Sequence, residues 1–293
     1  MRHVYECHLR WADLDSLGHI NNVVYVDYLQ EARVSLVRSV LGGGRDEGAD
    51  GADGANGAEG EEGVVVVRHE VTYLAPLAFR FRPVRIECWV TEVRAATFTL
   101  AYEVFHETDE PDASGGGTRT VYLRATTMLT PYVFSAERPR RLSAEEKLAL
   151  QPYLEAPDGA HTRRIPALDR AGAHRFPLHV RFSDVDVYRH VNNVKYFEYF
   201  QEARVRQMAE LTRDSGFERP TFVVAQTDVD YRVPILLRHE PYDVWSAIVA
   251  VGTRSMTIES EIADGDRVLA RARVTVVFFD SATQRSVAPA PAL

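Results

Sequence analysis

Residues 10–34 read RWADLDSLGHINNVVYVDYLQEARV, and residues 181–205 read RFSDVDVYRHVNNVKYFEYFQEARV. Fourteen of the 25 aligned positions are identical, at a constant offset of 171 residues. A repeat with so long a period indicates two copies of a whole domain rather than a solenoid. We therefore expect a tandem protein whose two halves share one fold.

The repeated stretch changes character along its length. Residues before Asp15 alternate as in a strand, residues 15–21 are polar, and the residues from Asn22 onward predict a helix over about 22–41. The apolar positions at helical spacing are Tyr25, Tyr28, Leu29, Ala32 and Leu36, with Tyr196, Tyr199, Phe200 and Ala203 in the second copy. The carboxylates Asp13, Asp15, Asp184 and Asp186 therefore lie where a strand leads into a helix.

The second copy, DVYRHVNNVKYFEYFQEAR, resembles the signature of the hotdog-fold acyl-CoA thioesterases, in particular the long-chain acyl-CoA and 4-hydroxybenzoyl-CoA thioesterase group. The first copy, DLDSLGHINNVVY, resembles the version of that signature that contains glycine. The resemblance implies an α+β double hotdog, in which each half is an antiparallel β-sheet wrapped around a long central α-helix. It also implies active sites at the interface of two such domains, which one chain can supply as an intramolecular pseudo-dimer; further association into a homo-oligomer stays open.

Asp15 and Asp186 match the second Asp of the D-x-D motif of that family, so the resemblance makes them the catalytic pair. A carboxylate can act as general base on water or attack the thioester itself. Backbone N–H groups at the adjoining helix N-terminus can stabilise the negative charge that develops on the thioester oxygen. We interpret Asp13 and Asp184 as structural.

Other residues of the motif are candidates for substrate binding or support. His19 and His190 could orient the carboxylate, contact the substrate or only bond to backbone. Asn side chains accept hydrogen bonds from helix N–H groups, which favours capping at Asn21 or Asn22 and at Asn192 or Asn193. Tyr25 and Tyr196 favour the core over the acyl pocket. Gly18, replaced by Arg189 in the second copy, would let the backbone approach a ligand closely.

Alternating apolar residues predict four strands after the first helix, and residues 3–13 predict one before it. Their inward faces are Val67, His69, Val71 and Tyr73; Val84, Ile86, Cys88 and Val90; Phe98, Leu100, Tyr102 and Val104; and Val121, Leu123, Ala125 and Thr127. We expect a first domain over 1–141 with a flexible acidic Gly/Ala loop at 42–63, and a linker over 142–172. Ser143 and Glu146 form a capping box for a short helix in that linker. The second domain spans 173–285, and 286–293 is a disordered tail.

Two further pairs repeat between the copies. Arg80 and Arg238 could contact CoA phosphates, but we favour solvated strand-edge residues. The Glu31/Arg33 and Glu202/Arg204 pairs are interpreted as surface or interface ion pairs.

Composition excludes several classes of protein. The net charge of −8 argues against a nucleic-acid partner, because phosphate binding needs a basic face. No apolar run reaches the roughly 20 residues of a membrane span, and we expect a cytoplasmic protein with two reduced, buried cysteines, Cys7 and Cys88. No G-x-S-x-G elbow, metal motif, Walker A motif or dinucleotide motif occurs, so we expect no metal and no cofactor.

We therefore predict an acyl-CoA thioesterase that hydrolyses fatty or aromatic acyl-CoA to free acid and CoA. Acyl carrier protein is the alternative acyl donor, although the plant acyl-ACP thioesterases carry Asn where this chain has Leu17 and Tyr188. A hotdog enoyl-thioester hydratase or dehydratase would resemble D-x-N-P-x-H, whereas Asp and His are four apart here and Asn-Pro is missing. The alternative from another class is a non-catalytic acyl-thioester-binding protein.

Overall fold

The structure is a computed structural model that divides into two compact units, residues 1–161 and 162–293. The residues that it describes are 1–41, 62–111, 117–156, 164–213, 221–280, 283 and 285–288. The acidic loop predicted at 42–63 lies outside the described residues except for its last two. Each unit is considered separately below.

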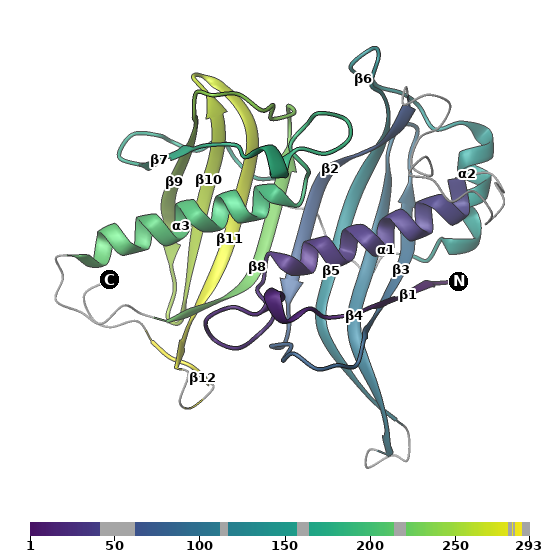
Figure 1. Ribbon diagram of the computed structural model, residues 1–293, viewed down its shortest axis with the longest axis horizontal. Coiled ribbons are helices and arrows are strands. Elements are labelled where there is room, and N and C mark those ends of the chain that lie inside the picture. The colour runs from purple at the N-terminus through teal and green to yellow at the C-terminus, as the bar shows by residue number, and fades with distance from the viewer. Residues whose placement is uncertain are drawn as a thin grey trace. The chain divides into compact units, whose positions relative to one another are not determined.

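The first unit is an antiparallel sheet with one long helix (Figure 1). Its strands are β1 (His3–Cys7), β2 (Glu62–Tyr73), β3 (Val84–Val93), β4 (Phe98–Pro111), β5 (Gly117–Val133) and β6 (Arg138–Pro139). Its helices are α1 (Val24–Leu41) and α2 (Ala144–Leu150), with 3₁₀ turns at η1 (Trp11–Asp13) and η3 (Gln151–Tyr153). The strands lie in the order β1-β3-β4-β5-β2, and β6 pairs with β5.

The second unit repeats this plan. Its elements are β7 (His174–Leu178), η4 (Phe182–Asp184), α3 (Lys195–Arg213), β8 (Phe222–Tyr231), β9 (Tyr242–Val251), β10 (Ser255–Asp264), β11 (Arg267–Asp280) and β12 (Arg285–Ser286). The order β7-β9-β10-β11-β8 matches that of the first unit strand for strand, with β12 paired to β11. Even the register repeats, because His3 pairs with Cys88 in one unit and His174 with Ser246 in the other.

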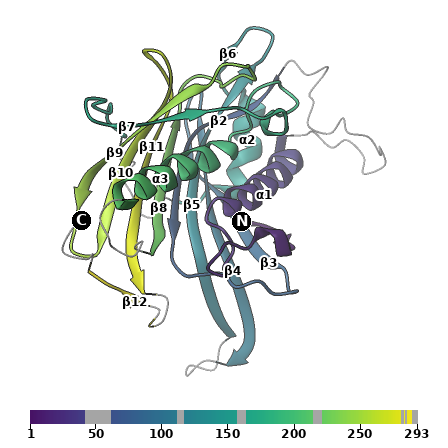
Figure 2. The ribbon, with the colours of Figure 1, turned by 60° about the vertical axis from the view of Figure 1, so that its left-hand side comes forward.

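Each long helix lies on one face of the sheet of its own unit, as Figures 1 and 2 both show. All of the helical positions predicted to be apolar and inward-facing are buried, from Tyr25 to Leu36 in α1 and from Tyr196 to Ala203 in α3. Helix α1 begins at Val24, two residues later than predicted, because residues 22–23 form a turn. Burial of this apolar stripe holds each helix to its sheet.

The alternation predicted for the strands is confirmed most clearly in β3 and β4, where all eight predicted inward residues are at most 1% exposed. The prediction of one strand over 3–13 was wrong at its end, since β1 stops at Cys7 and the chain turns at η1. Asp13 explains the turn, because its carboxylate accepts a hydrogen bond from the backbone N–H of Arg10 at 2.9 Å. That bond favours a tight turn over continued strand pairing.

The predicted linker is divided between the two units, and each part bonds within its own unit. The capping box is confirmed: the Ser143 hydroxyl accepts from the Glu146 N–H at 3.1 Å, and the Glu146 carboxylate accepts from the Ser143 N–H at 2.7 Å. Residues 142–156 bond to the first unit, for example where Glu155 N–H donates to Val90 O at 2.8 Å. Residues 164–173 bond to the second, where Leu168 N–H donates to Glu261.

At the C-terminus, β12 pairs with β11, and the N–H of Val287 donates to the carbonyl of Phe278 at 2.9 Å. Residues 286–288 of the predicted disordered tail are therefore described and partly paired. Residues 289–293 lie outside the described part of the chain. Within the described ranges, no helix has the length and apolar character needed to cross a lipid bilayer.

The interiors of the two units differ at matching positions. In the first unit Leu36 of α1 is buried together with Cys88 of β3 and Tyr102 of β4. The second unit has Gln207, Ser246 and Ser260 instead, with Gln207 Nε2 donating to the Ser246 carbonyl at 3.2 Å and the two serine hydroxyls 2.8 Å apart. Cys7 and Cys88 are free thiols and both are buried, which confirms the prediction of reduced cysteines.

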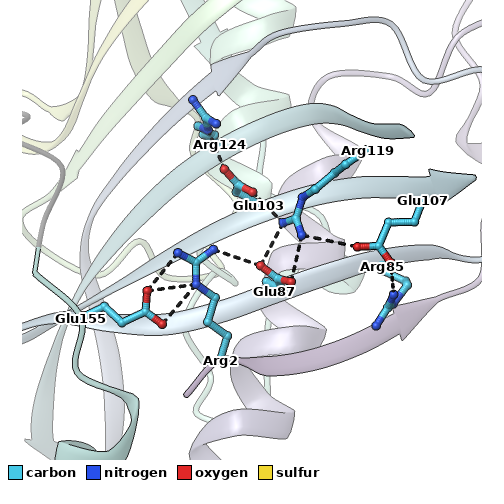
Figure 3. Close-up of polar contacts among 8 residues, drawn as sticks. All are labelled: Arg2, Arg85, Glu87, Glu103, Glu107, Arg119, Arg124 and Glu155. Carbon is cyan, nitrogen blue, oxygen red and sulfur yellow. Dashed lines mark hydrogen bonds and ion pairs between the residues drawn. The ribbon is translucent and has the colours of Figure 1, made fainter. Parts of the chain in front are cut away.

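The face of the first sheet that points away from α1 carries a network of arginines and glutamates (Figure 3). Arg119 contacts three carboxylates: Glu87 at 2.9 Å, Glu103 at 2.6 Å and Glu107 at 3.6 Å. Arg2 joins the network through Glu87 and Glu155, so it ties β1 to the segment after α2. Hydrogen bonding to Arg119 lowers the pKa of Glu87, because the guanidinium favours the ionised carboxylate.

Candidate active site

The repeated D-x-D segment forms the same closed turn in both units. After η1, the N–H of Asp15 donates to the carbonyl of His19 at 2.8 Å, and Leu14 pairs with Ile20 as an isolated bridge. After η4, the N–H of Asp186 donates to the carbonyl of His190, also at 2.8 Å. We call these the Asp15 turn (residues 13–21) and the Asp186 turn (residues 184–192).

The sixth residue of each turn has a left-handed backbone. Gly18 has a φ of +79° and Arg189 has a φ of +64°. Glycine adopts this conformation without strain, whereas another residue stores about 1–2 kcal/mol. The shape of the turn therefore accounts for Gly18, and close approach to a ligand, which the sequence suggested, is not needed to explain it.

The carboxylate of each candidate Asp is fixed through one oxygen. Oδ1 of Asp15 accepts from the N–H of Leu17 at 2.8 Å and of His19 at 3.2 Å. Oδ1 of Asp186 accepts from the N–H of Tyr188 at 2.9 Å and of His190 at 3.3 Å. Among the described residues, none donates a hydrogen bond to the other oxygen, Oδ2, of either side chain. Each turn thus orients one carboxylate oxygen, and the second has no donor among the described residues.

Burial makes the carboxylate of Asp186, in the second copy, more basic. Asp186 is half-buried, and loss of water around it raises its pKa above the ordinary value of 3.8. The N–H donors of Tyr188 and His190 act in the opposite direction, because they bond to the ionised form. A carboxylate with a raised pKa is a stronger base once it is ionised, which suits proton abstraction from water.

The first Asp of each pair is structural in its contacts, as the sequence suggested. Asp13 is 3% exposed and Asp184 is 2% exposed. Tyr28 of α1 donates its hydroxyl to Asp13, and Tyr199 of α3 donates to Asp184 at 2.7 Å. These bonds tie each D-x-D turn to the helix that follows it. In the sequence analysis we treated both tyrosines only as core residues and missed this contact. The signal was the repetition of each Asp and its tyrosine at the same offset of 171 residues in the two copies.

The asparagines hold the start of each helix. Asn21 Oδ1 accepts from the N–H of Val23, and Asn192 Oδ1 accepts from the N–H of Val194, both at 3.3 Å. The second asparagine of each pair serves through its backbone, since the carbonyl of Asn22 accepts from the hydroxyl of Tyr73 and the carbonyl of Asn193 from that of Tyr231, both at 2.8 Å. Capping is therefore made by the first Asn of each pair.

The histidines sit at the junction between the turn and the loop after β2 or β8. His19 forms a bridge with Ala78, and His190 forms one with Leu236. The positive charge of His190 lowers the pKa of Asp186, so its imidazole lies close enough to affect the carboxylate. An orienting or electrostatic role for the histidine is consistent with this position.

Tyr25 and Tyr196 belong to the core. Each is 3% exposed, and burial raises the pKa of both hydroxyls. The hydroxyl of Tyr196 accepts from the N–H of Ile235 at 3.1 Å. Their rings pack on Tyr73 and Tyr231, with centroids 5.8 Å and 4.9 Å apart. They therefore pack against the two strand tyrosines whose hydroxyls bond to Asn22 and Asn193.

Two sequence interpretations of arginines need correction. Arg33 and Arg204 are 6% and 8% exposed, so the Glu31/Arg33 and Glu202/Arg204 pairs are not surface ion pairs. Both arginines point inward because they occupy the buried stripe of their helix, eight residues after Tyr25 and Tyr196 respectively. Arg80 is exposed as predicted, whereas Arg238 is bonded to Asp264 at 2.9 Å.

Similar proteins identify the family. The chain matches the thioesterase-like superfamily over residues 9–149 and 180–293, which together cover both D-x-D turns and most of the two units. It is 31% identical over 122 residues to the long-chain acyl-CoA thioesterase FadM of Escherichia coli, a match that covers 38% of this chain and 86% of FadM. It is 34% identical over 79 residues to the uncharacterized protein YsmA of Bacillus subtilis, covering 27% of this chain and about half (53%) of YsmA.

Solved structures share the fold over almost the whole chain. The putative oleoyl thioesterase of Lactobacillus plantarum has a TM-score of 0.69 at 15% identity, covering 96% of this chain and 97% of that one. The 12:0-ACP thioesterase of Umbellularia californica has a TM-score of 0.70 at 17% identity, covering 94% and 93%. At these identities the likeness concerns the fold alone. Through the match of both its halves, this chain belongs to the thioesterase-like superfamily.

Proposed function

We propose that this protein hydrolyses acyl thioesters, with Asp15 and Asp186 as the reactive carboxylates. The observation that carries the proposal is the state of those side chains: Oδ1 is bonded to two backbone N–H groups and Oδ2 accepts from no described residue. The same arrangement occurs in both units, with the same spacing. The turn uses only Oδ1 of each carboxylate, so Oδ2 is the oxygen that we propose takes a proton from water.

In the proposed reaction, the Asp carboxylate takes a proton from water while the water oxygen bonds to the thioester carbonyl carbon. Collapse of the tetrahedral intermediate breaks the C–S bond, and the protonated Asp returns its proton to the leaving sulfur, which gives the free thiol and regenerates the carboxylate. The same carboxylate could instead attack the carbonyl carbon and form an anhydride that water then opens. Backbone N–H groups at the start of α1 and α3 are the proposed donors to the developing oxyanion.

The fold proposed for each half is the hotdog domain, in which the antiparallel sheet wraps around the long helix. Supporting observations are the burial of one stripe of α1 and α3, the identical strand order in both units, and the shared fold with thioesterases of known structure. The domain limits 1–141 and 173–285 remain part of this proposal.

The acyl donor that we propose is an acyl-CoA. The support is FadM, which is named a long-chain acyl-CoA thioesterase and is matched over 86% of its own length. An acyl carrier protein is the alternative donor, because one protein of the same fold is named a 12:0-ACP thioesterase. That second likeness, at 17% identity, supports the fold rather than the substrate.

The test is thiol release from a panel of acyl-CoAs in a series of variants. Asp15→Asn and Asp186→Asn should each lower turnover, and the double variant should fall by about 100- to 10,000-fold, the usual contribution of a general base. Glu31→Gln, on the exposed side of α1, is the matched control that removes a carboxylate elsewhere. Circular dichroism must show that all variants fold.

Undiminished turnover in the double variant would remove both carboxylates from the mechanism. Conversion of an enoyl-CoA without thiol release would indicate a hydratase, and tight acyl-CoA binding without any turnover would indicate a binding protein. The turnover that remains in each single variant shows how much of the activity each turn contributes. The two turns differ at Gly18 and Arg189.

A further inference from the structure

The first unit exposes a cluster of aromatic rings and arginines beside the Asp15 turn. We call it the aromatic–arginine patch, and it consists of Arg10, Trp11, Phe79, Arg80, Phe81 and Arg82. Trp11 is 74% exposed and Phe81 is 97% exposed. The ring of Phe79 lies between them, with its centroid 5.5 Å from that of Trp11 and 5.1 Å from that of Phe81. Large aromatic groups gathered in water usually mark a binding surface.

Backbone pairing joins the patch to the Asp15 turn. Ala78, the residue before Phe79, forms a bridge with His19, and the carbonyl of Leu77 accepts from the N–H of Ile20 at 2.9 Å. The N–H of Asp15 bonds to His19, His19 forms a bridge with Ala78, and Phe81 follows three residues after Ala78, so the Cα atoms of Asp15 and Phe81 are at most about 22 Å apart. An extended pantetheine arm with its diphosphate spans a comparable distance.

The arginines of the patch are exposed, and two of them have no carboxylate partner among the described residues. Arg80 is exposed, and no described residue forms an ion pair or side-chain hydrogen bond with it. Arg82 uses one nitrogen to donate to the backbone carbonyl of Glu107, which leaves its charge without a carboxylate partner among the described residues. Arg10 is paired with Asp13 but stays 66% exposed in its side chain. The patch therefore carries positive charge on a chain whose net charge is −8.

The second unit does not repeat this chemistry. The residues matching Phe79, Phe81 and Arg82 are Leu237, His239 and Glu240. Arg238 is bonded to Asp264 and stacks on Tyr242, with its guanidinium carbon 3.6 Å from the ring centroid. The patch is therefore a property of the first unit alone and not of the shared turn.

We propose that the aromatic–arginine patch binds the 3′-phosphoadenosine diphosphate portion of coenzyme A while the thioester occupies the Asp15 turn. This inference rests on the proposed function and specifies the acyl donor for the first site. An aromatic ring stacks on the adenine, and Arg80 and Arg82 bond to the phosphates. The phosphopantetheine of an acyl carrier protein has neither an adenine nor a 3′-phosphate, so the patch discriminates between the two donors.

The test compares two substrates that differ only in the nucleotide. The same acyl group is presented on CoA and on pantetheine, and kcat and KM are measured for Arg80→Ala, Phe81→Ala and the double variant. Loss of one stacking or phosphate contact should raise KM for the acyl-CoA about tenfold with kcat unchanged. KM for the acyl-pantetheine should change by less than about twofold, since it lacks the nucleotide. Phe182→Ala removes an 85%-exposed aromatic ring from the second unit and serves as the matched control.

A direct measurement separates this inference from the proposed function. Adenosine 3′,5′-bisphosphate is titrated into the full chain by calorimetry, and its affinity should fall in the Arg80 and Phe81 variants but not in Phe182→Ala. The proposed function fails if the unmodified protein releases no thiol from either substrate. The inference fails, with hydrolysis intact, if the patch variants raise KM equally for the acyl-CoA and the acyl-pantetheine, or if they raise KM for neither.

Two other results would overturn it. Patch variants that impair acyl-ACP hydrolysis but not acyl-CoA hydrolysis would identify a carrier-protein surface. Patch-dependent sedimentation with phosphatidylglycerol vesicles, together with unchanged binding of the bisphosphate, would identify a lipid surface. Because Arg80 and Phe81 are exposed, their substitution should leave the fold intact.

Discussion

Removal of the Tyr199 hydroxyl should destabilise the second unit by more than its single hydrogen bond suggests. Tyr199 donates at 2.7 Å to Oδ2 of Asp184, a carboxylate that is only 2% exposed. The one other donor to that carboxylate among the described residues is the N–H of Arg181 at 2.9 Å. Burial and the neighbouring carboxylate raise the pKa of Tyr199, so the hydroxyl is protonated, and available as a donor, throughout the working pH range.

The size of the effect follows from the charge of the acceptor. A hydrogen bond to a charged group contributes about 1.5–3 kcal/mol, and leaving the group underbonded in the interior places the loss near the upper end. With a urea m-value of about 2 kcal/mol/M, a loss of about 3 kcal/mol in Tyr199→Phe should lower the unfolding midpoint by about 1.5 M. Tyr28→Phe should cost less, about 1.5 kcal/mol, because Asp13 keeps the backbone and side-chain donors of Arg10.

The assay is urea unfolding of the full chain followed by circular dichroism, with hydrogen exchange to assign the loss to one unit. Exchange should accelerate across the Asp186 turn, because the carbonyl of Asp184 also accepts from the N–H of Asn192 at 2.8 Å. The matched control is Tyr231→Phe, which removes a hydroxyl donor to the neutral carbonyl of Asn193 and should cost about 1 kcal/mol. If Tyr199→Phe lowers the free energy of unfolding no more than Tyr231→Phe does, then the charge of the acceptor adds no stability and our account of the turn is wrong.

Three further predictions concern other parts of the chain. In Asp15→Asn, the activity that remains should fall with decreasing pH at a value above 3.8, because the carboxylate of Asp186 must be ionised and burial raises its pKa; a pH–rate profile that holds level down to pH 3.8 would contradict this. Ser143→Ala should lower stability by about 1 kcal/mol through loss of the α2 cap, measured as a urea midpoint, and no change would mean that α2 is held only by packing. Arg33→Met should be tolerated better than Arg33→Ala in thermal unfolding, because Nη1 of this buried guanidinium has no hydrogen-bond partner among the described residues and Met fills its volume without a charge; the reverse order would show that filling this volume with an apolar side chain does not stabilise the site.

Local patterns predicted the elements of the fold well. The spacing from Tyr25 to Leu36 gave the buried stripe of α1, and the alternation in β3 and β4 gave their inward faces, because both depend only on the period of the backbone. The strand predicted over 3–13 failed past Cys7, since a side-chain bond from Asp13 to the backbone outweighed the alternation. The repeat also fixed which residues of the two halves correspond.

Contacts between distant residues could not be predicted in the same way. The bond between Tyr199 and Asp184 joins residues 15 apart, and it exists only because the turn folds back over the start of α3. The inward position of Arg33 follows from helical spacing. In the sequence analysis we instead gave more weight to the charge of Arg33, which favours a position at the surface or an interface. Gly18 was explained by ligand approach when the left-handed backbone of the turn was the simpler cause.

The unequal interiors of the two units limit how this duplicated gene could recombine with itself. If α3 replaced α1, the amide of Gln207 would face Tyr102 and Cys88 in place of the serines that bond near it now. The reverse exchange would set Leu36 beside the hydroxyls of Ser246 and Ser260, and Ser260 is too small to fill the space that Tyr102 fills at the matching position of the first unit. Each helix is therefore matched to its own sheet, and crossovers inside a half should yield unstable hybrids, whereas crossovers that exchange entire halves should not.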